Sequence, residues 1–223
     1  MDRLRVMVVT APRPACGRPL PEIVVECAEA GATAIQLRDK EANGEELFRQ
    51  AMALRRALSG RAALLLVNDR LDVALAAGAD GVHLGPEDLP VAGARAVAPD
   101  GFLIGYSTDD PAAAREAAAA GADYLGVGAV FSTRSKAGLA EEAIGPDRVR
   151  AALAAARLPG LGIGGISAAN AARVAETGAG VAVLGAVMGA PHPGDVVAAI
   201  RAEVDRAHAS LAEGAEIPPE QER

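Results

Sequence analysis

Hydrophobic and polar residues alternate along this chain with two periods, one typical of helices and one of short buried strands. Four segments repeat a single pattern, in which helix-forming residues lead to a glycine and then to an apolar run. They are EAGATAIQL (29–37), AAGADGVHL (76–84), AAGADYLGV (119–127) and ETGAGVAVL (176–184). A glycine at that point suits the left-handed residue that ends many helices. The pattern predicts four units of helix, glycine and strand.

Four further apolar runs are predicted to be strands, and helical segments separate all of the strands. These runs are Leu4–Thr10, Ala63–Val67, Phe102–Tyr106 and Gly160–Ile163. The predicted helices cover residues 20–30, 44–59, 69–77, 90–97, 111–120, 145–156, 168–177 and 193–211. This alternation predicts an α/β fold, a single-domain (β/α)8 TIM barrel. An open doubly wound sheet is the alternative, but the turn VVTAPRPACG lacks the glycine-rich dinucleotide pattern.

No linker divides the chain. We expect the barrel to cover residues 1–211 and the polar stretch 212–223, AEGAEIPPEQER, to form a solvated, disordered tail. The longest connection without regular structure is 128–144, and loops of that length are often active-site lids.

Composition narrows the class of protein. The net charge of −7 without a basic run argues against nucleic acid as a partner. No stretch approaches a membrane span, and the first apolar run is too short for a signal peptide. Cys16 and Cys27 are too few for a disulfide framework and are expected to be free thiols. We therefore expect a cytoplasmic protein that acts on small molecules; its oligomeric state stays open.

Polar residues gather where the predicted strands end. The strand 64–67 runs directly into Asn68, Asp69 and Arg70, and five other strand ends carry polar or glycine-rich sets. In a barrel, all of these ends face one rim, where active sites lie. The cations at these ends suit a ligand with several phosphate oxygens, and two neutral groups add hydrogen bonds. The cations are Arg38, Lys40 and Lys136, and the neutral groups are Asn68 and Ser107.

Two carboxylates, Asp69 and Asp88, follow adjacent predicted strands. A pair of carboxylates beside bound phosphates is the usual protein contribution to a Mg²⁺ site. The alternative is that each aspartate caps the helix that follows it.

Backbone provides a second predicted anion site. Gly164 and Gly165 follow one strand and Gly185 follows the next, and barrels often bind phosphate at these two loops. Thr133 and Ser135 offer hydroxyl groups to the same ligand. The alternatives are structural: a tight turn at the paired glycines, and a satisfied core histidine at His83, which lies on an apolar strand.

Six motifs occur in the order and spacing of the thiamine-phosphate synthase family, which the chain resembles over nearly the whole barrel. They are QLRDK, LVNDR, GVHLGPEDLP, GADYLGVGAVFSTRSK, GIGGIS and GVAVLGAV. The resemblance implies a transferase that joins hydroxymethylpyrimidine pyrophosphate to hydroxyethylthiazole phosphate. It also implies Mg²⁺ as the cofactor and phosphorylated small molecules as the substrates.

The resemblance assigns a role to each site residue. Asp69 and Asp88 bind Mg²⁺, Gln36 binds the pyrimidine ring, and His83 lies close to that ring. The residues that hold the pyrophosphate are Arg38, Lys40, Asn68, Ser107 and Lys136, and all of them except Asn68 are counted as catalytic. The residues that hold the thiazole phosphate are Thr133, Ser135, Gly165, Leu184 and Gly185.

The chain departs from the family pattern at three places. Ala11 replaces an aspartate, Ser135 replaces a threonine, and Gly185 replaces a serine. These changes bear on substrate affinity more than on the reaction.

Three rivals stay open. A thiazole tautomerase, from a sister family, uses a histidine where this chain has Asp109. A sugar-phosphate epimerase or aldolase requires acids, histidines or a desolvated lysine on the strands. A barrel that binds thiamine phosphate without turnover is the rival that is not an enzyme.

Overall fold

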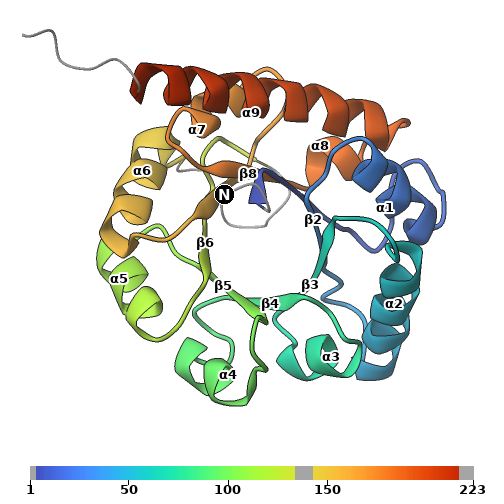
Figure 1. The fold of residues 1–223 in the computed structure, drawn as a ribbon. Helices are drawn as coiled ribbons and strands as arrows, with labels where there is room; N and C mark the ends of the chain where they lie inside the picture. The colour runs from blue at the N-terminus through green and yellow to red at the C-terminus, as the bar shows by residue number, and fades with distance from the viewer. Residues whose placement is uncertain (1–3, 134–142, 216–223) are drawn as a thin grey trace, which may run out of the picture.

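Eight parallel strands close into a barrel, in strand order β1 to β8, in the computed structural model of this chain (Figure 1). The structure describes residues 4–133 and 143–215. The strands are β1 (Val6–Val9), β2 (Ala34–Leu37), β3 (Leu64–Asn68), β4 (Gly81–Leu84), β5 (Leu103–Ser107), β6 (Tyr124–Gly128), β7 (Gly160–Ile163) and β8 (Gly180–Val183). The closed order confirms the predicted (β/α)8 barrel and excludes the open sheet.

A ring of helices surrounds the strands (Figure 1). The helices of the described residues are α1 (Leu20–Glu29), α2 (Gly44–Ala57), α3 (Leu71–Ala76), α4 (Val91–Val97), α5 (Pro111–Ala119), α6 (Gly145–Ala156), α7 (Ala171–Ala175), α8 (Gly185–Met188) and α9 (Pro193–Ala215). No helix of the described residues is long and apolar enough to cross a membrane.

Two helices differ from the prediction. The short helix α8 was not predicted, because its residues GAVM continue the apolar run of β8 without a polar break. Helix α9 extends to Ala215 instead of ending at residue 211, since Ala and Glu at 212–215 favour helix even where the chain is polar. Figure 1 shows α9 lying across α7 and extending to α1. The rest of the predicted tail, 216–223, lies outside the described residues.

Three of the four repeated glycines end helices as predicted, while Gly178, with a φ of 86°, lies two positions after the C-cap residue of α7, Glu176. Gly31, Gly78 and Gly121 have φ values of 106°, 62° and 100°, and each directly follows the C-cap residue of a helix. At the first of them, the Gly31 N–H donates to the Ala28 carbonyl and the Ala32 N–H to the Cys27 carbonyl. These two bonds form a Schellman motif, which satisfies carbonyls that the helix leaves without partners. The same pair of bonds occurs after α3 and α5.

Alternating strand residues build two hydrophobic layers. One set faces the helices and forms the larger core, in which Val8, Ile35 and Ile104 are fully buried. The other set fills the inside of the barrel with Met7, Leu66, Tyr124 and other side chains. Since strand side chains alternate between the two faces, this packing fixes which polar residues point into the barrel.

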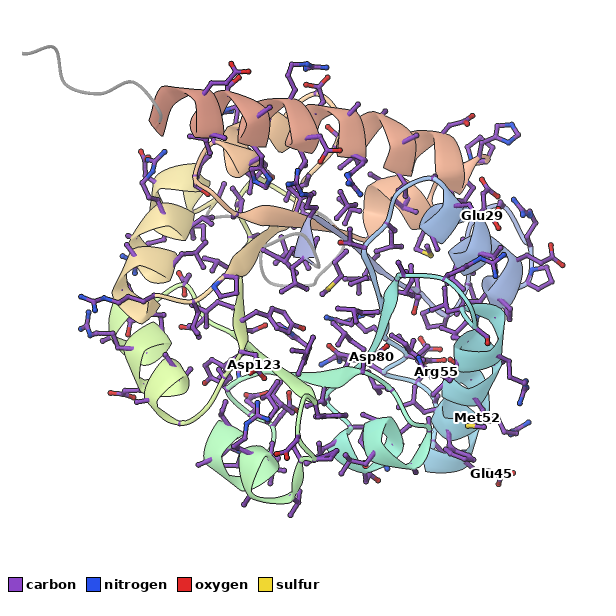
Figure 2. The ribbon with its side chains drawn as sticks, in the orientation of Figure 1. Glu29, Glu45, Met52, Arg55, Asp80 and Asp123 are labelled. Atoms are coloured by element: carbon purple, nitrogen blue, oxygen red, sulfur yellow. The ribbon has the colours of Figure 1, made fainter. Side chains whose placement is uncertain are left out.

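The N-terminal end of the barrel is closed by polar side chains that bind strand backbone. Asp80 accepts a hydrogen bond from the Leu65 N–H at 2.7 Å, and Asp123 accepts one from the Ile104 N–H at 2.7 Å. An arginine pairs with each carboxylate: Arg55 lies 3.4 Å from Asp80, next to it in Figure 2, and Arg95 pairs with Asp123. These contacts attach the starts of β3 and β5 to the residues that precede the neighbouring strands β4 and β6.

Candidate active site

Four polar side chains occupy the upper level of the barrel interior, at or near the C-terminal ends of adjacent strands. They are Gln36 on β2, Asn68 on β3, His83 on β4 and Ser107 on β5. Each comes two positions after a residue on the inner face of its strand, which is Ala34, Leu66, Gly81 or Gly105. Asn68 also lies directly opposite His83 in the strand register. The strand periodicity therefore brings together four of the predicted binding residues.

Asp69 does not cap the helix that follows it. Helix α3 has Arg70 at its N-cap and no side-chain cap, and the Arg70 guanidinium pairs with Asp72. Asp69 has a φ of 63°, and its N–H donates to the His83 carbonyl at 2.8 Å. A left-handed conformation is costly for a residue other than glycine and is often found at functional sites. The capping alternative is wrong for Asp69.

Asp88 does not cap the next helix either. Helix α4 begins after Pro90 without a side-chain cap, and the Asp88 carboxylate accepts a hydrogen bond from the Gly85 N–H at 2.7 Å. Burial and the neighbouring Asp88 carboxyl raise the pKa of Asp69, and Lys40 opposes them. The structure therefore places the two predicted metal ligands side by side.

Mg²⁺ fits this pair of carboxylates. Both are oxygen donors, which Mg²⁺ prefers, and a like-charged pair that is partly buried favours a cation between its members. The described residues contain no cluster of three or more acidic, histidine or cysteine side chains able to hold a metal. Two carboxylates with further ligands from substrate phosphates are the usual arrangement for Mg²⁺.

The loop after β2 holds Lys40 near the carboxylates, with its Nζ atom 3.3 Å from Asp69 Oδ2. Asp39 organises this loop: its carboxylate accepts hydrogen bonds from the Glu41 and Ala42 N–H groups and from Gln50 of α2. These bonds lower the pKa of Asp39 despite its partial burial, so the loop is well anchored at neutral pH.

Thr10 supports the predicted site residue Arg38, a role that sequence reasoning missed. It is fully buried after β1, and its hydroxyl accepts a hydrogen bond from the Arg38 N–H at 3.0 Å. The only sequence signal near Thr10 was the next residue, Ala11, which replaces the aspartate of the family pattern. The bond fixes the backbone from which the Arg38 side chain extends.

His83 is both a satisfied core histidine and a rim residue. It is 8% exposed, its Nδ1 atom lies 2.9 Å from the Tyr124 hydroxyl, and its Nε2 atom lies 2.8 Å from Ser107 Oγ. Burial lowers the pKa of His83 to about 4, so the ring is neutral at physiological pH. Tyr124 is the second residue that sequence reasoning missed.

The backbone conformation of the loop after β7 requires glycine at positions 164 and 165. Gly164 and Gly165 have φ values of 98° and 65°, and a Cβ atom at Gly165 would lie 2.5 Å from the Ser132 carbonyl oxygen. Asn170 supports the turn by donating to the Gly165 carbonyl and accepting from the Ser167 N–H. The pair does form a tight turn, and phosphate binding at this turn stays a prediction.

The other predicted residues are distributed between described and undescribed parts. Leu184 is the N-cap of α8, Gly185 is its first residue and is exposed, and Thr133 lies on the loop after β6. Ser135 and Lys136, with most of the predicted lid, lie outside the described residues.

A surface hollow of about 720 Å³ lies far from these residues, at the N-terminal end around Arg55, Arg61 and Asp80. Its arginines have structural partners, since Arg55 pairs with Asp80 and Arg61 binds Glu29 and the Ala57 carbonyl. None of the predicted site residues lines it, so we place the active site at the opposite rim.

Comparisons with known proteins point to one family. The sequence profile of the family described as "Thiamine monophosphate synthase" matches residues 6–187. A thiamine-phosphate synthase of Methanoculleus marisnigri is 50% identical over 203 residues, covering 89% of this chain and 92% of the relative. A thiamine-phosphate synthase of Haloarcula marismortui is 44% identical over 204 residues, covering 90% of this chain and 97% of the relative. The solved structure of the thiamine phosphate pyrophosphorylase of Pyrococcus furiosus superimposes with a TM-score of 0.83 at 40% identity, covering 93% of this chain and 98% of that one.

Proposed function

The chain belongs to the thiamine monophosphate synthase family, and from that premise we propose how its C-terminal rim carries out the reaction. The protein is a transferase of thiamine biosynthesis that condenses hydroxymethylpyrimidine pyrophosphate with hydroxyethylthiazole phosphate. Both relatives have the name of the synthase, which favours it over the tautomerase rival. The observation that supports the site is the convergence of Asp69, Asp88 and Lys40 beside Asn68 and Ser107.

The pyrophosphate of the first substrate binds at this cationic rim. Arg38 and Lys40 offer positive charge, while Asn68 and Ser107 offer neutral hydrogen bonds from β3 and β5, the two strands that flank β4. Lys136, from outside the described residues, joins them by the family pattern.

Asp69 and Asp88 would hold Mg²⁺ together with oxygens of that pyrophosphate. When bound, the ion supplies positive charge that stabilises the leaving group. The raised pKa of Asp69 supports the assignment, because its causes are burial and the neighbouring Asp88 carboxyl, and a bound cation would offset both.

The pyrimidine ring lies deeper, against Gln36. Gln36 is 5% exposed, and among the residues that the structure describes its amide donates only to the thioether of Met7, at 3.5 Å. A sulfur atom is a weak acceptor, so the amide keeps most of its hydrogen-bonding capacity for a heterocycle.

The thiazole phosphate binds on the other side of the mouth. We assign it to the loops after β6, β7 and β8, through Thr133, Ser135, Gly165, Leu184 and Gly185. The glycines let an anion approach backbone N–H groups closely.

The reaction requires charge stabilisation and positioning rather than a protein nucleophile. Arg38 and Lys40 stabilise the charge that develops as pyrophosphate leaves the methylene carbon, and the thiazole nitrogen then attacks that carbon. The aminopyrimidine ring supports the positive charge left behind. Burial raises the pKa of Cys27 to about 12, so this cysteine stays a thiol and takes no part. Free cysteines also support a cytoplasmic location.

A product assay tests this proposal. Purified protein is mixed with both phosphorylated precursors, with and without Mg²⁺, and thiamine phosphate is measured. We expect product only with Mg²⁺, loss of product in Asp88→Asn, and normal turnover in Asp72→Asn, which changes an exposed carboxylate paired with Arg70. Product formed equally well without any divalent ion, or by Asp88→Asn, would contradict the assigned metal site.

A further inference from the structure

A hydrogen-bonded chain of three side chains crosses the inside of the barrel below the proposed pyrophosphate site. Tyr124 of β6 bonds to His83 Nδ1 at 2.9 Å, and His83 Nε2 bonds to Ser107 Oγ at 2.8 Å. The chain starts at a fully buried hydroxyl and ends at the partly exposed Ser107, on the rim. It therefore connects the apolar interior to a group that we assign to the substrate.

Two strand glycines make room for this chain. Gly105 pairs with His83 on one side and with Tyr124 on the other, and a Cβ atom there would lie 2.1 Å from Tyr124 Cζ and 2.5 Å from His83 Nδ1. A Cβ atom at Gly126 would lie 2.9 Å from His83 Cε1. Such distances exclude any other residue at Gly105 without movement of the two rings. The position of the His83 imidazole therefore requires glycine, which has no side chain, at both Gly105 and Gly126.

Hydrogen-bond accounting fixes the direction of the chain. A neutral imidazole donates at one nitrogen and accepts at the other, and a tyrosine hydroxyl has one proton to donate. Among the described residues, His83 Nδ1 is the hydrogen-bond partner that the structure gives to the Tyr124 hydroxyl. If Nδ1 had the proton, the buried Tyr124 hydroxyl would have no acceptor, which is costly inside a protein. Tyr124 therefore donates to Nδ1, and the imidazole proton lies on Nε2.

The proton on Nε2 determines what Ser107 can do. Nε2–H donates to Ser107 Oγ, so this lone pair of the serine is occupied by a protein donor. The serine proton is then left to point away from His83, toward the mouth of the barrel. An oriented hydroxyl donor at that place suits an anion, and the donor costs no reorganisation when charge develops.

We propose that Tyr124 and His83 are positioning residues, which hold Ser107 as a hydrogen-bond donor to the leaving pyrophosphate. The inference rests on the proposed function, because Ser107 is assigned to the pyrophosphate there. It gives His83 a role different from direct hydrogen bonding to the pyrimidine, since both of its ring nitrogens are already bonded within the protein.

A double-mutant cycle with Tyr124→Phe and Ser107→Ala tests the chain. We expect Tyr124→Phe to lower kcat about tenfold when Ser107 is present, as for a misaligned donor at developing charge. In the Ser107→Ala background, the same change is expected to lower kcat by less than about twofold, because its effect passes through Ser107. Tyr106→Phe is the matched control, since Tyr106 lies on β5 and packs against the outer core. Equal losses in both backgrounds would overturn the proposal.

The tautomer gives a second readout that does not depend on turnover. Nitrogen-15 NMR of the imidazole side chains, assigned with His83→Gln, is expected to show His83 protonated at Nε2 and unprotonated at Nδ1. A ring protonated at Nδ1 in an active enzyme overturns the chain alone. A wild-type protein that makes no thiamine phosphate overturns the proposed function instead, so the two failures are distinguishable.

Discussion

At the N-terminal end of the barrel, Asp80 and Asp123 each pair with an arginine, whereas at the C-terminal end Asp69 and Asp88 lie beside each other. Each of the first two also accepts a strand N–H, so its charge is used within the fold. Burial and the neighbouring Asp88 raise the pKa of Asp69, and Lys40, with its Nζ atom 3.3 Å from Asp69 Oδ2, opposes this shift only in part.

The difference shows how one residue type serves stability and chemistry. A carboxylate that is paired with an arginine and bonded to a strand N–H holds strands together. Its negative charge is already compensated, so it attracts a cationic ligand only weakly. A carboxylate beside another one costs free energy in the unliganded protein, and a bound cation can recover it. We therefore expect substitutions at the two ends to separate turnover from stability.

The largest expected effect is on turnover at the C-terminal end. Asp69→Asn is expected to lower kcat about 10²–10³-fold, as for the loss of one group that stabilises developing charge. The free energy of unfolding should stay equal or rise, because the fold already disfavours the charge of Asp69. Steady-state kinetics and urea unfolding of the same preparation measure both. A loss of turnover below tenfold would remove Asp69 from the site.

The next effect is on stability at the N-terminal end. Asp123→Ala removes the acceptor of the Ile104 N–H and the partner of Arg95. We expect the free energy of unfolding to fall by about 2 kcal/mol, with kcat of the folded enzyme unchanged. Asp100→Ala, on an exposed loop, is the control. If Asp123→Ala instead lowered kcat at full stability, the two ends would not be separate.

A pH titration of stability probes the interior below the rim. The folded-state pKa of His83 is about 4, below its ordinary value of 6.5, so the unfolded chain takes up this proton first. Stability therefore falls as the pH is lowered through this interval, by about 1 kcal/mol between pH 6.5 and about pH 5.5. Asp69 contributes with the opposite sign, because its pKa is raised. The difference between wild type and His83→Gln isolates the histidine; a difference that is independent of pH would contradict its neutral burial.

The smallest effect concerns a helix end next to Asp123. Gly121 has a φ of 100°, and an added Cβ atom would lie 3.1 Å from Arg95 Cγ, on the arginine that pairs with Asp123. Gly101 has a φ of 78° with nothing within 4 Å of such an atom. Both Gly→Ala changes cost about 1 kcal/mol for the left-handed backbone. We expect Gly121→Ala to cost about 0.5 kcal/mol more, and equal costs would show that Arg95 adjusts freely.

Local patterns predicted the fold well. The glycines at 31, 78 and 121 end helices through bonds made within a few residues, so the sequence contains the whole signal. The polar residues at the C-terminal ends of the predicted strands likewise predicted the rim on which Asn68 and Ser107 lie. Helix α8 was missed because four residues are too few to show a helical period.

The finer structure of the site depends on contacts between distant segments. Whether Asp69 caps a helix or faces Asp88 is decided by a φ of 63° and a bond to His83, and neither has a local signal. The Tyr124–His83–Ser107 chain depends on the register of three strands. Thr10 binds the Arg38 N–H, 28 positions away. Sequence reasoning proposed the groups that would contact the substrate and missed residues that hold some of them in place, such as Thr10 and Tyr124.

The most direct test is calorimetric titration of pyrophosphate with Mg²⁺ into three proteins: wild type, Asp88→Asn and Asp123→Asn. Pyrophosphate is a product of the reaction, so its binding reports the site without requiring turnover. We predict that wild type and Asp123→Asn bind it with the same affinity and that Asp88→Asn binds it at least about tenfold more weakly. Equal binding by Asp88→Asn, or weak binding by a folded Asp123→Asn, would contradict the assignment of chemistry to one end of the barrel and stability to the other.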